Sequence, residues 1–320
     1  MEIDIDKLVE EFERGSRVAV ARLITLIEND SDSAQVVLDR IFSRTQKAFR
    51  IGFTGPPGAG KSTLVYRLSK YYRALDKTIG IIAVDPTSPF SGGALLGDRI
   101  RMQELTSDPG VFVRSLASRG SLGGISRCTD DVADLLDAFG KDLILIETVG
   151  VGQSELEIAE KAHTVVVILV PESGDSIQAM KAGLMEIGDI FVMNKADHSS
   201  AEVAAREIED TLRLKDTSEG GWRPRVVLTS AIENRGVEEL ATAIEEHREY
   251  LLTAGVLEKK RRKNLYSRVR ENILERLEER FLNSERVAGI LKKRMEDVYA
   301  LKVSPYRVAR ELEQYLKIDI

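Results

Sequence analysis

The sequence contains only one cysteine, Cys128, and three histidines among its 320 residues. A single cysteine cannot form a disulfide within the chain or build a cysteine-based metal site, and such scarcity fits a reducing compartment. The histidines, His163, His198 and His247, are far apart and lack the spacing of metal ligands. The sequence therefore gives no indication of a disulfide framework, a zinc site or a nickel site.

Long hydrophobic runs and an excess of basic residues are also missing. No stretch of about 18 apolar residues occurs, so no membrane span is expected. The chain opens on an acidic, polar segment rather than the basic and then apolar pattern of a signal peptide, which favours a cytoplasmic location. The net charge of −6 and pI near 5.4 argue against nucleic-acid binding, and the basic run Lys259–Lys263 is better explained as a solvated helix face.

Short apolar segments alternate with amphipathic ones through the middle of the chain. Continuous apolar runs are typical of parallel strands that are buried on both faces. This pattern predicts an α/β fold with a doubly wound, mostly parallel sheet. The predicted strands are Arg50–Thr54, Ile79–Val84, Val111–Arg114, Leu143–Glu147, Thr164–Val170, Asp189–Asn194 and Arg225–Thr229.

Helical patterns flank this region on both sides. In the first 46 residues, two sets of apolar residues recur at helical spacing, namely Val18, Leu23, Ile24 and Ile27, then Val36, Val37, Leu38 and Ile41. Near the end, an i, i+4 stripe runs through Leu265, Val269, Ile273, Leu277 and Phe281, and it fits either an internal core or a dimer seam. We therefore expect an N-terminal helical extension (residues 1–46), a central domain (47–246) and a C-terminal helical arm (247–320).

A phosphate-binding loop lies between the first predicted strand and the helix that follows it. Residues Gly55-Pro56-Pro57-Gly58-Ala59-Gly60-Lys61-Ser62 fit the pattern G-x-x-x-x-G-K-[ST], and Thr63 follows. Glycines let backbone N–H groups converge on phosphate oxygens, and the following helix adds the positive end of its dipole. We expect Lys61 to reach the β- and γ-phosphates and Ser62 to coordinate Mg²⁺.

Three acidic residues are candidates for the metal shell beside this loop. Glu147 ends an apolar strand, where an acid can face the phosphates and hold Mg²⁺, and Gly150 three residues later can give its N–H to the γ-phosphate. Asp85 ends the second strand, and Asp98 lies in a glycine-punctuated loop. For Asp85 and Asp98, an exposed loop acid without a metal role is an equally good explanation at this point.

A second motif predicts which base the site prefers. Asn194-Lys195-Ala196-Asp197 follows a predicted strand, and Asp197 can accept hydrogen bonds from the N1–H and exocyclic amine of guanine, which adenine does not offer there. Lys195 would lie along the base, and Asn194 would tie the loop to the phosphate loop. Ser230-Ala231-Ile232, after the next strand, resembles the loop whose backbone N–H meets guanine O6. The two motifs together predict a GTPase.

The long segment between Asp85 and Glu147 resembles the branch of GTPases that includes signal-recognition and metallochaperone proteins, rather than Ras. Within that branch the chain resembles the MeaB/ArgK group, chaperones of adenosylcobalamin-dependent acyl-CoA mutases. The matching stretches are Gly55–Thr63, Val84–Pro89, Gly92–Arg99, Arg119–Gly124, Glu147–Glu155 and Asn194–Asp197.

This resemblance implies specific roles and partners. Lys61, Asp85, Asp98 and Glu147 would be phosphate and Mg²⁺ residues, and Asp175, Gln178 and Lys181 would belong to a switch loop through which a mutase, such as methylmalonyl-CoA mutase, raises GTP hydrolysis. The protein would bind GTP and GDP, form a homodimer through its C-terminal helices, and gate the delivery or replacement of adenosylcobalamin.

Two other functions are alternatives to this one. They are an ATPase or kinase associated with amino-acid transport and a nickel-insertion GTPase. The guanine motif argues against the first, and the scarcity of cysteine and histidine argues against the second.

Overall fold

The central feature of the chain is a seven-stranded sheet, seen in a computed structural model that describes residues 4–29, 32–85, 103–117, 128–148, 154–171, 183–214 and 221–315. Every strand pairing is parallel, and the spatial order is β3-β2-β4-β1-β5-β6-β7. The strands are β1 (Phe49–Thr54), β2 (Ile79–Asp85), β3 (Val111–Ala117), β4 (Leu143–Glu147), β5 (Thr164–Leu169), β6 (Ile190–Met193) and β7 (Arg225–Leu228). The predicted doubly wound fold is confirmed, and the strand ends differ from the predicted ones by no more than three residues.

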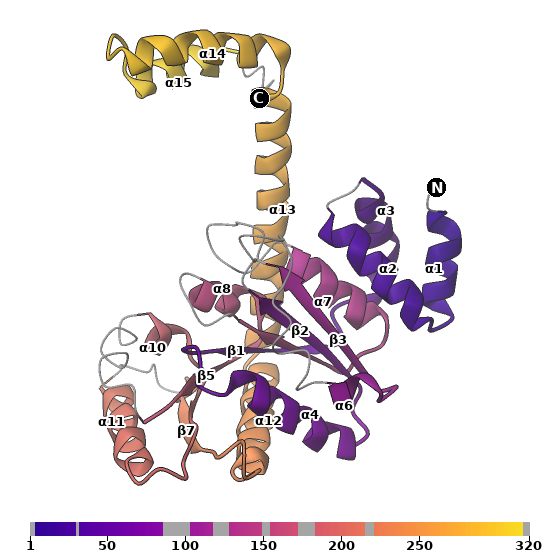
Figure 1. Ribbon diagram of the computed structural model, residues 1–320, viewed down its shortest axis with the longest axis vertical. Coiled ribbons are helices and arrows are strands. Elements are labelled where there is room, and N and C mark those ends of the chain that lie inside the picture. Colours follow the sequence, from indigo (N-terminus) through magenta and orange to yellow (C-terminus); the bar gives the residue numbers. More distant parts are fainter. Residues whose placement is uncertain are drawn as a thin grey trace. The chain divides into compact units, whose positions relative to one another are not determined.

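Alternate residues of the strands face two separate cores. In β4, Ile144 and Ile146 belong to one apolar cluster, while Leu143 and Leu145 belong to the other. The first cluster is covered by α2 (Arg17–Glu28), α7 (Cys128–Ala138) and α8 (Ser154–Lys161), and the second by α4 (Lys61–Ala74) and α12 (Val237–Thr253). Figure 1 shows α7 and α8 on one side of the sheet and α4 and α12 on the other. Burial on both faces explains why the strands are apolar throughout.

Short helices complete this part of the chain. They are α3 (Asp32–Ile41), η1 (Phe42–Arg44), α6 (Gln103–Thr106), α10 (Leu184–Ile187) and α11 (Ala201–Arg213). Within the described residues, none of the helices is both long and apolar enough to cross a membrane.

The N-terminal region is helical, as predicted. Helices α1 (Ile5–Glu13) and α2 begin at the capping side chains of Asp4 and Ser16, which accept hydrogen bonds from backbone N–H groups. Leu23 and Ile24 are buried, but Val18, which we placed on the same apolar face, is exposed. The buried face of α2 begins instead at Ala19 and includes Val20, and Val18 lies about 200° around the helix from Val20. Val36 of α3 is also exposed, because it lies about 200° around the helix from the buried Ala34.

One buried ionic cluster ties the sheet to α7. Arg50 in β1 contacts Asp130 at 3.1 Å and Asp134 at 2.5 Å, and Lys161 of α8 contacts Asp130 at 2.7 Å. Asp137, one turn after Asp134, accepts hydrogen bonds from backbone N–H groups just before β1. Burial raises the pKa of Asp137, although those hydrogen bonds oppose the shift. Each buried charge therefore has a partner of opposite sign or a backbone donor.

The chain forms two compact units, Met1–Lys260 and Arg261–Ile320. Helix α13 (Val256–Leu282) is continuous across this boundary. In the second unit, α14 (Glu285–Tyr299) and α15 (Pro305–Glu313) begin at the capping residues Ser284 and Ser304, and Pro305 follows Ser304 at the first position of α15. They share a small core that contains Val287, Val308 and Leu312.

The predicted apolar stripe on α13 is mostly accessible. Val269, Ile273 and Leu277 are 57%, 53% and 40% exposed, which an internal core does not allow. Phe281, at the end of the stripe, packs against the small core of the second unit, so the exposed part from Val269 to Leu277 remains available for an intermolecular contact.

Candidate functional site

The phosphate-binding loop joins the carboxyl end of β1 to the first turn of α4. Three of its glycines have positive φ, with values of +136° at Gly55, +89° at Gly60 and +75° at Gly58. A Cβ at Gly55 would lie 2.0 Å from the carbonyl oxygen of Ile168, so a larger residue cannot fit there. Gly60 is also the N-cap of α4 and makes no side-chain cap, which leaves the helix N-terminus open toward an anion.

Lys61 lies inside this loop rather than extending into solvent. It is buried, and its Nζ donates hydrogen bonds to the carbonyl oxygens of Gly55 at 2.9 Å and Pro56 at 3.1 Å. These contacts hold the ammonium group at the centre of the loop, where phosphate oxygens would lie. Its position fits the predicted role in phosphate binding.

Ser62 and Glu147 come together at the edge of the sheet. Ser62 Oγ donates to Glu147 Oε1 at 2.6 Å, and both residues are buried. A hydroxyl and a carboxylate oxygen are the hard donors that Mg²⁺ prefers, so this pair fits the predicted metal. Both residues were predicted as metal ligands, and their direct hydrogen bond across 85 residues of sequence arises because β4 lies beside β1.

Asp85 is the last residue of β2, the strand next to β4. β2 pairs with β4 with Ala83 opposite Glu147, so the chain at Asp85 emerges at the same edge of the sheet. The side chain of Asp85, and all of Asp98, Gly150 and Lys181, lie outside the described residues, as do Gln153, Asp175 and Gln178. Among the residues that are described, no group of three or more histidine, cysteine or acidic side chains forms a further metal site.

Asn194 joins the predicted guanine loop to the phosphate loop. Its Nδ2 donates to the carbonyl oxygen of Ala59 at 2.7 Å, and its Oδ1 accepts from Thr229 Oγ1 at 3.0 Å and from the backbone N–H of Ala231 at 3.1 Å. A Cβ at Gly60 would lie 2.4 Å from the same Nδ2, so the glycine is needed for this approach. Asn194 therefore has the tying role that the motif predicted. Thr229 was not predicted, although its position directly before Ser230 was a signal.

Asp197 is held as an acceptor by neighbouring donors. Ser230 Oγ donates to Asp197 Oδ1 at 3.0 Å, and the two residues are 33 positions apart in the chain. Its own backbone N–H and the Ser230 hydroxyl lower the pKa of Asp197, because both stabilise the ionised carboxylate. Lys195 in the same loop has a positive φ of 57°, in the left-handed region. The structure thus brings the two predicted base-binding segments together.

The loop after β7 is closed on itself. The backbone groups of Ser230 and Arg235 exchange hydrogen bonds at 3.0 and 3.1 Å, and Arg235 Nη2 donates to the carbonyl oxygen of Ala196 at 2.9 Å. The predicted residues Ala231 and Ile232 lie within this closed turn. Arg235 was not predicted, because no motif spacing marks it.

Known proteins share this architecture and sequence. The sequence profile of the family described as methylmalonyl Co-A mutase-associated GTPase MeaB matches residues 20–286. A relative from Pyrococcus abyssi is 52% identical over 268 residues, which cover 83% of each chain. The mouse protein named methylmalonic aciduria type A homolog, mitochondrial, is 36% identical over 293 residues, covering 85% of this chain and 70% of that one.

A solved structure described as a LAO/AO transport system kinase matches with a TM-score of 0.74 and 25% sequence identity, covering 99% of this chain and 100% of that one. The profile match extends over the phosphate loop, Glu147 and the predicted guanine loop. The chain belongs to the family of methylmalonyl-CoA mutase-associated GTPases.

Proposed function

We propose that this protein is a GTP-hydrolysing chaperone that gates the delivery, protection or replacement of adenosylcobalamin in an acyl-CoA mutase. The observation that carries the GTPase part is the Asn194 side chain, which joins the guanine loop to Ala59 of the phosphate loop. The mutase part is supported by the family to which the chain belongs.

Guanine selection rests on the charge and setting of Asp197. Ionised and held by Ser230, the carboxylate can accept from the two donors on the Watson–Crick edge of guanine. Adenine would leave this acceptor unsatisfied, which a polar site rejects strongly. This feature argues against an ATP-dependent kinase of amino-acid transport, although the solved structure that matches this chain is named a LAO/AO transport system kinase.

Hydrolysis would proceed by in-line attack of water on the γ-phosphate. When bound, Mg²⁺ would neutralise charge on the β- and γ-phosphate oxygens, held by Ser62 and Glu147 and, as further proposed ligands, Asp85 and Asp98. Lys61 would exchange its bonds to Gly55 and Pro56 for phosphate oxygens and stabilise the charge that develops in the transition state. The N–H of Gly150 would report the presence of the γ-phosphate.

The client would act on the segment that contains Asp175, Gln178 and Lys181. We propose that mutase binding places Lys181 near the nucleotide and accelerates hydrolysis, an ordering switch of the kind that many GTPases use. We further propose a cytoplasmic homodimer that pairs through the C-terminal arm. The expected boundaries at residues 46 and 246 are part of this proposal.

The test is phosphate release from GTP with and without an adenosylcobalamin-dependent mutase encoded beside this gene. We expect acceleration by the mutase, preference for GTP over ATP, and a lower ratio of stimulated to basal rate in Lys181→Ala. Lys70→Met, an exposed lysine on α4, is the control and should keep the wild-type ratio. A mutase that neither binds nor stimulates would remove the chaperone function and leave the GTPase.

A further inference from the structure

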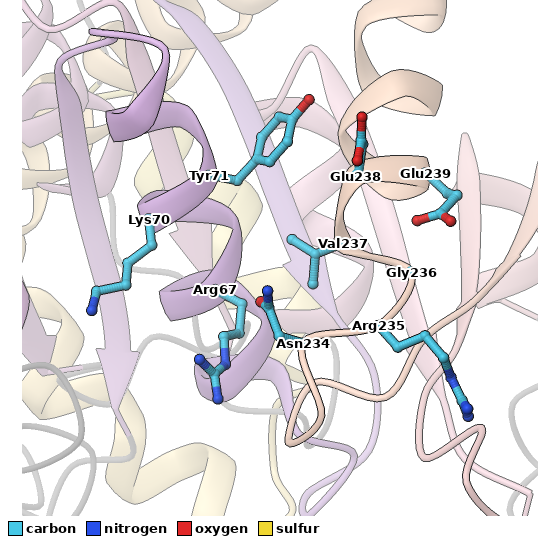
Figure 2. Close-up of a pocket in the computed structure, with 9 residues that line it drawn as sticks. All are labelled: Arg67, Lys70, Tyr71, Asn234, Arg235, Gly236, Val237, Glu238 and Glu239. Carbon is cyan, nitrogen blue, oxygen red and sulfur yellow. The ribbon is translucent and has the colours of Figure 1, made fainter.

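Arg67 contacts the guanine loop from the outside of the nucleotide site. It lies on α4, two turns after the phosphate loop, and its guanidinium donates from Nε to the carbonyl oxygen of Ala231 at 3.0 Å and from Nη2 to that of Ile232 at 3.1 Å. These contacts span 164 and 165 residues of sequence. In Figure 2, Arg67 extends from α4 toward the segment that carries Asn234 and Arg235.

The first of these contacts determines where a backbone donor points. The carbonyl of Ala231 and the N–H of Ile232 belong to the same peptide group, which is planar and trans, so the two bonds point in opposite directions. Because Arg67 holds the carbonyl on the α4 side, the Ile232 N–H is directed away from α4. A hydrogen bond from a charged donor to the carbonyl also polarises the peptide and makes its N–H a better donor.

Of the three backbone N–H groups in Ser230-Ala231-Ile232, the first two already donate to protein acceptors. The N–H of Ser230 donates to the carbonyl oxygen of Arg235 at 3.0 Å, and the N–H of Ala231 donates to Asn194 Oδ1 at 3.1 Å. Within the part of the chain that the structure describes, the N–H of Ile232 donates to no protein acceptor. An unused backbone donor beside Asp197 and Asn194 suits a carbonyl group on the base.

The Ile232 side chain cannot hold this peptide in place, since it is 79% exposed. Two hydrogen bonds from one rigid guanidinium can do so, because its donors lie in a fixed plane. The orientation of the peptide is therefore set by α4, the same helix whose first turn faces the phosphates.

We propose that Arg67 is a positioning residue for base recognition, which orients the Ala231–Ile232 peptide so that its N–H meets O6 of guanine. This inference rests on the proposed GTP binding and adds a determinant of base specificity to it. Through Arg67, the helix that follows the phosphate loop also fixes a donor at the opposite end of the nucleotide.

Replacement of Arg67 is compatible with folding. The side chain is half-buried and borders a pocket of about 490 Å³ that is lined by the α4 residues Lys70 and Tyr71 and by the segment 234–239. A shorter or uncharged side chain at this position borders open space rather than a closed core. Loss of Arg67 should therefore change nucleotide binding more than stability.

The experiment measures binding of GDP and of 6-thioguanosine diphosphate, in which a weakly accepting sulfur replaces O6, to the full-length protein with Mg²⁺. The proteins are wild type, Arg67→Met, Arg67→Lys and Lys70→Met. Lys70 is the matched control, because it lies one turn later on α4, borders the same pocket and pairs with Glu104 at 2.5 Å rather than with the loop.

Arg67→Met should bind GDP about five- to tenfold more weakly than wild type, which corresponds to the loss of one oriented hydrogen bond. The preference for GDP over the thio analogue should shrink by a similar factor. KM for GTP should rise while kcat at saturating GTP changes less than twofold, because the phosphate end is untouched. The GDP affinity of Arg67→Lys should be intermediate, because a single ammonium group replaces the planar guanidinium with its several donors. The GDP affinity of Lys70→Met should match that of wild type.

Two results would overturn the proposal, namely unchanged GDP affinity in Arg67→Met, or an equal loss for both nucleotides. Thermal melting without nucleotide checks that each variant is folded, and Arg67→Lys, which keeps the charge, decides the matter if Arg67→Met is unstable. Failure of the wild-type protein to bind GDP would instead refute the proposed function. The two failures are thus distinguishable.

Discussion

The hydroxyl of Ser62 donates to Glu147 Oε1 at 2.6 Å, which joins the first turn of α4 to the end of β4 inside the protein. A metal that bound both oxygens would replace this hydrogen bond with two coordination bonds. The affinity for nucleotide should therefore depend on Glu147 when Mg²⁺ is present and much less when it is absent.

Glu147→Gln should lower kcat for GTP hydrolysis by about 100-fold or more, because it removes a charge that holds the metal close to the phosphates. The mutation should weaken GDP binding in the presence of Mg²⁺ but change it little in EDTA. Lys61→Ala is the contrasting variant and should weaken binding under both conditions. Phosphate release and calorimetric titration measure these effects.

The control for Glu147→Gln is Glu239→Gln, which removes an acid on α12 that borders the outer pocket. It should behave as wild type. Equal weakening of GDP binding by Glu147→Gln with and without Mg²⁺ would show that Glu147 does not act through the metal.

Asp197→Asn should reverse the base preference of the site. The amide that replaces the carboxylate offers a donor to the base, which suits the carbonyl at position 2 of xanthine rather than the amine of guanine. GTP should bind at least 100-fold more weakly, and xanthosine triphosphate should bind better than to wild type. Glu202→Gln, which removes an exposed acid on α11, should leave GTP affinity unaltered. Unchanged GTP binding by Asp197→Asn would contradict the assignment.

His247 should make the fold sensitive to acid. It is buried, its Nδ1 lies 2.8 Å from Thr164 Oγ1, and its Nε2 lies 3.4 Å from Asp189. Burial lowers its pKa from 6.5 to about 4, against the attraction of Asp189 and with the repulsion of Lys260. The unfolded chain thus takes up a proton at a higher pH than the folded chain.

The free energy of unfolding should therefore fall as the pH drops through 6.5 toward 4, by about 2 kcal/mol between pH 7 and pH 5 from this residue. His247→Asn should remove that part of the pH dependence, whereas His198→Asn, on the surface, should retain it. Urea unfolding at both pH values gives the comparison, and Trp222, whose ring centroid lies 4.6 Å from that of His247, is a local fluorescent probe. A slope unchanged by His247→Asn would refute the assignment.

Leu277→Asp should convert a dimer to a monomer if the stripe on α13 pairs with a second copy. Because Leu277 and Ile273 are exposed within the chain, the substitution should leave the melting temperature of the folded unit nearly unchanged. Light scattering gives the mass, and melting checks the fold. Glu278→Lys, at the next position around the helix, should keep the wild-type mass, and a monomeric wild-type protein would rule out the seam.

Sequence patterns predicted the strands and the two nucleotide motifs because both depend on residues close together in the chain. Apolar runs predicted β4 and β5, and the spacing of glycines and Lys61 predicted the phosphate loop. The strand ends were less accurate, as at β3, which continues three residues past Arg114. Pairing with β2 extends that strand, and such pairing is not visible in local sequence.

The sequence did not predict contacts that depend on the packing of distant elements. Arg50 is the first residue of the predicted strand Arg50–Thr54, yet its charged side chain is buried against Asp130 and Asp134, 80 and 84 residues away. Arg67 likewise follows no motif, because its partners are two carbonyl oxygens, which every residue possesses. Only the fold brings such groups within hydrogen-bonding distance.

The amide of Asn194 couples the binding of the two ends of the nucleotide. One side chain touches both Ala59 of the phosphate loop and the turn at Ala231. A ligand that orders one loop therefore reduces the conformational entropy that the other loop loses when its own ligand binds. Guanosine and diphosphate, offered as separate fragments, should then bind with positive cooperativity, each raising the affinity for the other. The intact nucleotide would thus gain an advantage over its parts beyond their covalent connection.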